Sequence, residues 1–136
     1  MLVREVLRKA PVTAPPGCTL REAARIMTDH GVGALLIMEG DRLAGIATDR
    51  DIVIRAVAKG IGPGATVDTV MTDQLVTIGG GSDVRDAYEL FRRHMVRRLP
   101  VVEDGQLGGM LTLDDLLIRS AAELAGLVQP VTGEVL

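Results

Sequence analysis

Aromatic residues are nearly missing from this chain of 136 residues, which has one Tyr, one Phe and no Trp. A protein that binds single-stranded nucleic acid needs aromatic side chains on which the bases can stack. A basic excess is missing too, since 18 acidic residues outnumber 15 Lys and Arg residues and the formal net charge is −3. Both shortages argue against a nucleic-acid-binding protein, so we expect no nucleic acid partner.

Cysteine and long apolar runs are also scarce. Cys18 is the only cysteine, which excludes an intrachain disulfide and favours a reducing compartment. The longest uncharged, mainly apolar run, residues 31–38, is too short to cross a bilayer. The first five residues lack the basic-then-apolar order of a signal peptide. We therefore expect a cytoplasmic protein that has no membrane partner.

An internal repeat dominates what is present. Residues 12–55 align with residues 76–119 without a gap, and 15 of the 44 aligned positions are identical. Such a match marks a duplication, and two copies favour a pseudo-twofold pair over a solenoid. We place the first repeat at residues 1–64 and the second at 65–126, followed by a C-terminal tail, 127–136, without a clear period.

Each repeat reads as a β-α-β-β-α unit. Thr19 and Glu22 form a capping box at a helix start, an apolar stripe follows at helical spacing, and Gly31 ends the helix. On the last helix of each repeat we expect two sets of residues to face inward: Ile52, Val53, Ala56 and Val57, and Leu116, Leu117, Ser120, Ala121 and Leu124. The predicted strands are 12–13, 34–38, 43–47, 99–102 and 107–111, and the predicted helices are 19–31, 49–59, 83–94 and 113–125.

One motif occurs in both repeats at the same place. It is Leu43-x-Gly45 followed by Thr48-x-x-Asp51, and Leu107-x-Gly109 followed by Thr112-x-x-Asp115. Each copy predicts a strand that ends in a threonine capping the next helix. The free N–H groups of such a helix start favour an anion. A plain capping box explains the same Thr and Asp without a ligand, and the two interpretations are compatible.

These motifs, together with the runs Gly31–Leu36 and Val96–Val102, resemble the tandem CBS domain pair, the module named after cystathionine β-synthase. The resemblance covers about residues 3–125 and is closest to free-standing bacterial members. The run Thr48–Val53 is similar to that of stress- or hypoxia-linked members. The resemblance implies an α/β fold in which two β-α-β-β-α repeats pack as a pseudo-twofold pair. It also implies a regulatory module rather than an enzyme, with no catalytic residue and no metal.

The resemblance further implies an adenosine-type ligand between the repeats, either AMP, ADP, ATP or S-adenosylmethionine, and no required cofactor. Carboxylates suit ribose hydroxyls, and hydroxyl and guanidinium groups suit phosphate. Because Gly33-Ala34 stands where the second repeat has Arg97-Arg98, we expect one site to bind phosphorylated ligands more tightly. The implied ribose contacts are Asp51 and Asp115; the phosphate contacts are Thr48, Thr112, Arg97 and Arg98; the adenine contacts are Thr13, Ala14, Pro15, Thr77, Ile78 and Gly79.

Alternatives remain at several positions. The arginines at 92 and 93 also fit a solvated helix end, where cations complement the dipole. His30, His94 and Cys18 show no recognised metal spacing, and we favour structural roles for them. The leading hypothesis is a nucleotide sensor that signals to a protein partner, and the alternative is a constitutive scaffold with vestigial clefts. The resemblance implies a homodimer, and small and apolar residues on the last helices would allow close packing against another copy: Ala56, Val57, Ser120 and Ala121.

Overall fold

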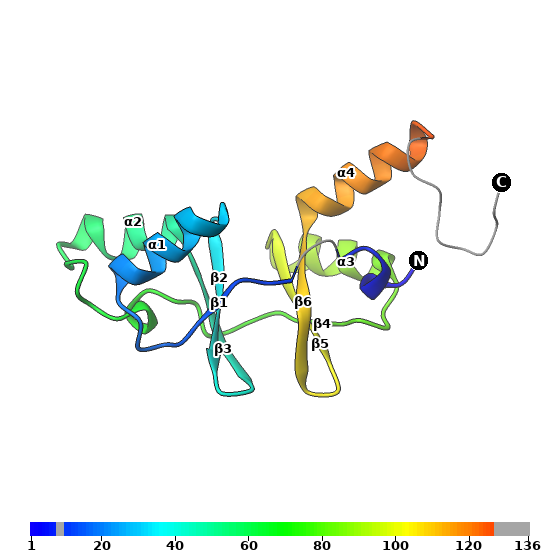
Figure 1. Cartoon of the computed structure of the whole chain (residues 1–136). Helices are drawn as coiled ribbons and strands as arrows, with labels where there is room; N and C mark the ends of the chain where they lie inside the picture. Colours follow the sequence, from blue (N-terminus) through cyan, green and yellow to red (C-terminus); the bar gives the residue numbers. More distant parts are fainter. Residues whose placement is uncertain (8–9, 127–136) are drawn as a thin grey trace. The chain divides into compact units, whose positions relative to one another are not determined.

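The computed structural model describes residues 1–7 and 10–126 of the chain and contains two compact units (Figure 1). One unit is Pro11–Leu75, and the other joins the first residues of the chain to the part from Val76 onward. Each unit has its own three-stranded sheet and its own apolar core. The predicted α/β class with two β-α-β-β-α repeats is confirmed.

In the first unit the sheet has the order β1-β2-β3. Strand β1 runs parallel to β2, and β2 runs antiparallel to β3. Figure 1 shows α1 and α2 side by side, next to this sheet. The elements are β1 (Thr13–Ala14), α1 (Leu20–His30), β2 (Ala34–Glu39), β3 (Arg42–Thr48), α2 (Asp49–Arg55) and two 3₁₀ turns, Val57–Lys59 and Val67–Thr69.

The second unit repeats this plan with the order β4-β5-β6. Strand β4 runs parallel to β5, and β5 runs antiparallel to β6. The elements are a 3₁₀ turn at Val3–Glu5, β4 (Ile78–Gly79), α3 (Val84–His94), β5 (Arg98–Glu103), β6 (Gln106–Thr112) and α4 (Leu113–Leu124).

The predicted helix signals act as expected at α1. The side chain of Thr19 accepts a hydrogen bond from the backbone N–H of Glu22, which satisfies one of the free donors of the first turn. Gly31 ends the helix in the left-handed region, with φ 62°, where glycine has no Cβ to clash. Both ends of α1 are therefore set by single residues that the sequence identifies.

The opening segments of the two repeats are exchanged in space. Val3 and Val6 are buried in the core around Leu99, within the second unit. Their repeat counterparts Val67 and Val70 are buried in the first unit. The predicted boundaries, 1–64 and 65–126, follow the sequence repeat, but the compact units do not. The opening segment of the first repeat belongs to the second unit, and the opening segment of the second repeat belongs to the first unit. The physical reason is that the valines of each opening segment fill the apolar core of the unit in which they are buried.

The last helix of each repeat differs from its prediction. The α-helix in the first unit stops at Arg55 and continues as a 3₁₀ turn, and Val53 and Val57 are exposed, the latter by 67%. On α4, Leu117 and Ala121 are exposed and Leu124 is 90% exposed, so these inward predictions are wrong. Apolar residues cover two faces of each helix, and only one face packs on its own unit.

The predicted bounds of the strands and of the other helices agree with the structure to within one or two residues at each end. The tail 127–136 lies outside the described residues. Within residues 1–7 and 10–126, every helix is too short or too polar to span a membrane.

Candidate functional site

The sheet topology gathers the predicted site residues at one end of each unit. Thr13 opens β1, Ala34 opens β2, and Thr48, the register partner of Ala34, closes the antiparallel strand β3. In the second unit Thr77 immediately precedes β4, while Arg98 opens β5 beside its register partner Thr112 at the end of β6. Three stretches that lie far apart in sequence therefore meet where the helix α2 or α4 begins.

The predicted adenine contacts are of two kinds. Ala14 and Ile78 are buried and belong to the two apolar cores, so only their backbone groups can face a ligand. The residues that flank them are exposed, because successive side chains of a strand point to opposite faces. These exposed residues are Thr13, Pro15, Thr77 and Gly79.

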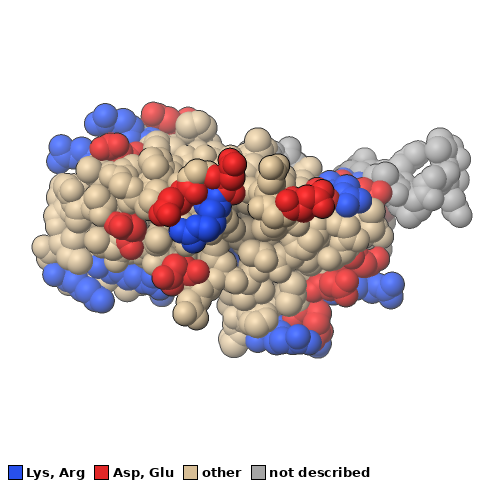
Figure 2. Space-filling view, turned by 90° about the horizontal axis from the view of Figure 1, so that it is seen from below, with Lys and Arg blue, Asp and Glu red and all other residues tan. Residues whose placement is uncertain are grey.

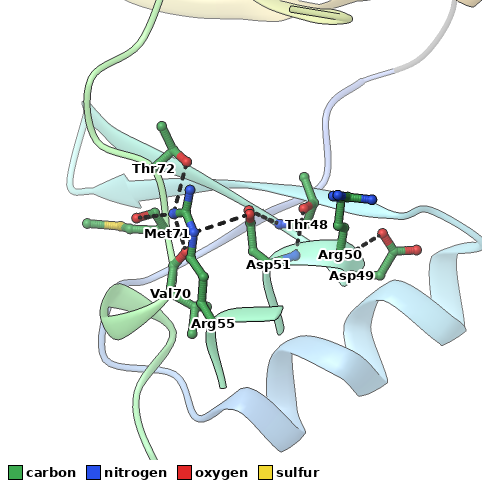
Figure 3. Close-up of polar contacts among 8 residues, drawn as sticks. All are labelled: Thr48, Asp49, Arg50, Asp51, Arg55, Val70, Met71 and Thr72. Atoms are coloured by element: carbon green, nitrogen blue, oxygen red, sulfur yellow. Dashed lines mark hydrogen bonds and ion pairs between the residues drawn. The ribbon is translucent and has the colours of Figure 1, made fainter. Parts of the chain in front are cut away.

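The Thr48-x-x-Asp51 motif forms a reciprocal capping box in the first unit (Figure 3). The Thr48 hydroxyl accepts from the backbone N–H of Asp51 at 3.1 Å, and the Asp51 carboxylate accepts from the backbone N–H of Thr48 at 3.0 Å. The structural interpretation of this motif is thus realised in full, and it satisfies two donors of the first turn.

Arg55 adds a second set of contacts that the sequence did not indicate. One terminal nitrogen of its guanidinium group donates to the carbonyl of Val70 at 3.0 Å, to the carbonyl of Met71 at 3.4 Å and to the hydroxyl of Thr72 at 3.2 Å. Its Nε lies 3.8 Å from Asp51 Oδ1 (Figure 3). Both oxygens of Asp51 are therefore engaged within the protein, and a ribose would have to share them.

Acidic groups also surround the start of α2. The Asp49 carboxylate lies so close to Gly33 that a Cβ there would be 3.0 Å from its Oδ2, and the Asp49 N–H donates to the Gly33 carbonyl at 2.9 Å. With Asp51 in the same turn, two carboxylates stand at this helix start. Arg50 stands between these two carboxylates, and α2 has only seven residues to supply a dipole.

The start of α4 in the second unit is richer in cations. The Thr112 hydroxyl accepts from the backbone N–H of Asp115 at 3.0 Å, so the threonine cap is the same. Arg97 forms an ion pair with Asp114, and both side chains are well exposed. Arg98 lies on the neighbouring strand end beside Thr112. Helix α4 has 12 residues. Two arginines and a threonine hydroxyl thus come from the residues at the start of this longer helix.

The glycine of each Leu-x-Gly motif serves packing. A Cβ at Gly45 would lie 2.8 Å from both the Met71 sulfur and the Thr72 carbonyl oxygen. A Cβ at Gly109 would lie 2.9 Å from the Leu7 side chain. Each glycine therefore leaves room for an exchanged opening segment, which the sequence analysis did not foresee. The signal was available, because the repeat extends to the valine pairs Val3/Val67 and Val6/Val70.

The histidine and cysteine residues have local roles. His30 Nδ1 lies 3.0 Å from the Ile26 carbonyl on its own helix. Burial raises the pKa of the Cys18 thiol, and the neighbouring Glu22 carboxylate raises it further, which disfavours a reactive thiolate. No group of three or more His, Cys, Asp or Glu side chains among residues 1–7 and 10–126 is arranged to hold a metal ion.

Charged side chains of both signs are interspersed on the face that Figure 2 shows, and neither sign covers a large area of the coloured residues there. This distribution gives no electrostatic track for a nucleic acid backbone on that face.

Two curated relatives resemble the chain along most of its length. It is 36% identical over 125 residues to the CBS domain-containing protein YhcV of Bacillus subtilis, covering 91% of this chain and 89% of the relative. It is 37% identical over 100 residues to hypoxic response protein 1 of Mycobacterium tuberculosis, covering 72% and 70%.

Two solved structures share the fold. The CBS domain protein PAE2072 from Pyrobaculum aerophilum, complexed with AMP, has a TM-score of 0.82 and 29% identity and covers 92% of this chain and 97% of its own. The CBS domain pair of protein MJ0100, in complex with 5-methylthioadenosine and S-adenosyl-L-methionine, has a TM-score of 0.81 and 27% identity, with coverage of 90% and 98%. The CBS domain family model matches residues 3–57 and 67–122. With both repeats matched, the chain belongs to the CBS domain family.

Proposed function

We propose that this protein is a regulatory module that binds an adenine nucleotide and signals its presence to a partner, without catalysing a reaction. The observation that carries the proposal is the gathering of Thr112, Arg97 and Arg98 at the start of α4 in a CBS domain pair. Related pairs are solved with AMP and with 5-methylthioadenosine and S-adenosyl-L-methionine, which supports an adenosine-type ligand.

The second unit supplies the tighter site in this proposal. Arg97 would leave Asp114 and present its planar fork to a phosphate, joined by Arg98 and the Thr112 hydroxyl. Exchange of partners is inexpensive, because an exposed ion pair contributes only about 0–1 kcal/mol. Asp115 would accept from the ribose hydroxyls, and the exposed residues Thr77 and Gly79 would border the adenine. We infer a weaker site in the first unit, because Gly33 and Ala34 stand where the second unit has Arg97 and Arg98.

We further infer that a second copy of the chain covers the exposed apolar faces of α2 and α4. Exposed apolar residues occupy equivalent positions in the two repeats, Val53 with Leu117 and Ile54 with Ile118. A symmetric partner matches such a repeated surface. Hollows of about 290 and 450 Å³ lie along α1 and α2 and are lined mainly by apolar side chains. Sedimentation of the wild type should give a dimer, and Leu117→Glu should shift it toward the monomer.

The absence of a metal site stays a prediction. The assignment to a cytoplasmic compartment stays a prediction.

Thermal unfolding in the presence of AMP, ADP, ATP or S-adenosylmethionine tests the sensor. A ligand at 100 times its Kd stabilises the folded state by about 2.7 kcal/mol, which raises Tm by several degrees at this size. The rise should be lost in Arg98→Ala and Asp115→Ala and kept in Asp51→Ala, the matched change in the first unit. Each shift is measured against the same variant without ligand, so that a weakened cap does not count as lost binding.

A scaffold with vestigial clefts is the second candidate, favoured by the engagement of both Asp51 oxygens with Thr48 and Arg55. If none of the four ligands raises Tm, the Thr112-x-x-Asp115 motif is a helix cap only and the scaffold replaces the sensor.

A further inference from the structure

The C-terminal end of α3 carries a short exposed segment that the proposed nucleotide site leaves unused. We use the name basic loop for the last residues of α3, Arg92, Arg93 and His94, together with Met95, which follows them. All four residues are exposed, and Met95 is 89% exposed. Met95 also ends α3 in the left-handed region, with φ 53°.

The fold itself does not require a methionine at this position. Its repeat counterpart is Gly31, which ends α1 with φ 62°. A side chain with a Cβ is disfavoured in this region, whereas glycine is not. Met95 therefore costs conformational energy and also leaves a large apolar side chain in water. A residue that is unfavourable on both counts indicates a role outside the folding of the unit.

The charges of the basic loop are not required by the fold either. Thr28 and Asp29 stand where the second repeat has Arg92 and Arg93. Helices α1 and α3 nevertheless have the same length of 11 residues. Both arginines contact Glu89 on their own helix, yet their side chains stay 79% and 62% exposed and keep free donors. The first repeat thus serves as an internal control. It shows that a helix of this length ends at this position without the two arginines.

We propose that the basic loop is a docking surface for a short acidic segment of a protein partner, which places an apolar side chain against Met95. Carboxylates pair with the free donors of Arg92 and Arg93, and the flexible thioether side chain of Met95 adapts to an apolar neighbour. The inference rests on the signalling part of the proposed function, because it names the kind of partner that reads the module.

An acidic peptide fits this surface better than a nucleic acid or an anionic lipid surface does. Glu89 lies within the patch, exposed by 43%, and a continuous phosphate backbone would meet this carboxylate. A peptide can place a neutral residue there. The chain has one Tyr and one Phe to stack on bases. A lipid surface would gain the burial of one apolar side chain from the basic loop, which is little for membrane attachment.

The first test is Met95→Gly, which installs the residue of the first repeat. We expect this variant to raise Tm by a few degrees, because it removes the left-handed strain. A display library of random short peptides, selected on the wild-type protein, should enrich acidic sequences that contain an apolar residue. An enriched peptide should bind Met95→Gly about tenfold more weakly or worse, as loss of one buried side chain predicts. A stabilised variant that loses binding cannot owe the loss to unfolding.

The matched control is Gly31→Met, which should lower Tm and leave peptide affinity unchanged. The double change Arg92→Thr with Arg93→Asp transplants the charges of the first repeat, and it should weaken the peptide further and remove most of the salt dependence of binding. Arg97 and Arg98 stay unchanged, because they belong to the proposed nucleotide site.

Three results would overturn the inference. They are a selection that enriches no acidic peptide, equal affinity of the peptide for wild type and Met95→Gly, and tighter binding of a single-stranded oligonucleotide or a phosphatidylserine vesicle than of any peptide. The Tm shifts with AMP, ADP, ATP and S-adenosylmethionine, measured in the same variants, keep the two proposals apart. Peptide binding without a nucleotide shift leaves the docking surface in place and removes the sensor, and the reverse result removes only the docking surface.

Discussion

The two helix starts use one motif and differ in what surrounds it. In both units a threonine hydroxyl caps the helix by accepting from the N–H of the Asp three residues on. The arginine one turn later is also the same, yet Arg55 reaches the segment 70–72, whereas Arg119 pairs with Glu123 on its own helix. The counterpart of Glu123 is Lys59, which cannot form this ion pair with an arginine. Among the described residues the two arginines therefore have different partners, the opening segment in the first unit and a helix residue in the second.

Substitution of the glycines in the two Leu-x-Gly motifs should give the largest difference in stability between the two units. Gly45→Ala should destabilise the protein by about 2–3 kcal/mol, because its Cβ meets the Thr72 carbonyl, which is backbone and yields little. Trimming Met71 to Ala should therefore rescue it only in part. Gly109→Ala should cost about 1–2 kcal/mol, and Leu7→Ala in the same chain should relieve its clash. Urea unfolding of the single and double variants measures these differences, and equal rescue in both units would contradict the distinction.

The next contrast is between the two arginines. Arg55→Met keeps the aliphatic stem but removes the hydrogen bonds to Val70 and Thr72, and it should cost about 1–2 kcal/mol. Arg119→Met removes one ion pair on its own helix and should cost less than about 0.5 kcal/mol. Denaturant unfolding again gives both values. A cost for Arg119→Met as large as that for Arg55→Met would mean that the arginines act alike.

The smallest contrast depends on pH. Helix α1 is capped by Thr19, whereas α3 is capped by Asp83 at the equivalent position. The N–H of Arg85 donates to the Asp83 carboxylate, and with the positive N-terminus and the Arg85 side chain it lowers the pKa of Asp83. A lowered folded pKa gives stability that is present above the ordinary carboxyl pKa and is lost as the pH falls through the folded value.

Asp83→Thr should therefore remove a small acid-dependent part of the unfolding free energy. Wild type and variant should differ by a constant amount near neutral pH, and the difference should change only below about pH 4. Unfolding measured across this range checks the sign, and Thr19→Asp should introduce the same dependence at α1. An identical pH profile for wild type and Asp83→Thr would show that the cap carries no such dependence.

Most of the fold could be predicted because its signals are local. The caps at Thr19, Thr48 and Thr112 and the stop at Gly31 each act within one turn, and the apolar runs become β2 and β5. The exchange of the opening segments could not be predicted, because the repeat shows that Val3 and Val67 are equivalent but not which core receives them. Exposure of Val53 and Leu117 was missed since a helix with apolar residues on two faces does not reveal which face packs.

The positions of the predicted site residues in the fold were predictable, whereas some of their contacts were not. The register of β5 and β6 places Arg98 beside Thr112, as the order of strands in the motif suggests. The Asp51–Arg55 contact is an i,i+4 pair and is therefore local. The hydrogen bond from Arg55 to Val70 reaches 15 residues further along the chain, and no local pattern predicts it. The ribose and phosphate roles stay predictions until ligand binding is measured.

The exchanged opening segments also order events during synthesis of the chain. Val3 and Val6 leave the ribosome well before the strands that bury them, which follow only from Ile78 onward. The unit Pro11–Leu75 already contains every segment of its own core when residue 75 has been made. Domains generally fold as they emerge, so the unit Pro11–Leu75 should fold first and the segments of the other unit should come together last. The core that contains Val3 and Val6 can therefore form only after the strands from Ile78 onward have been made.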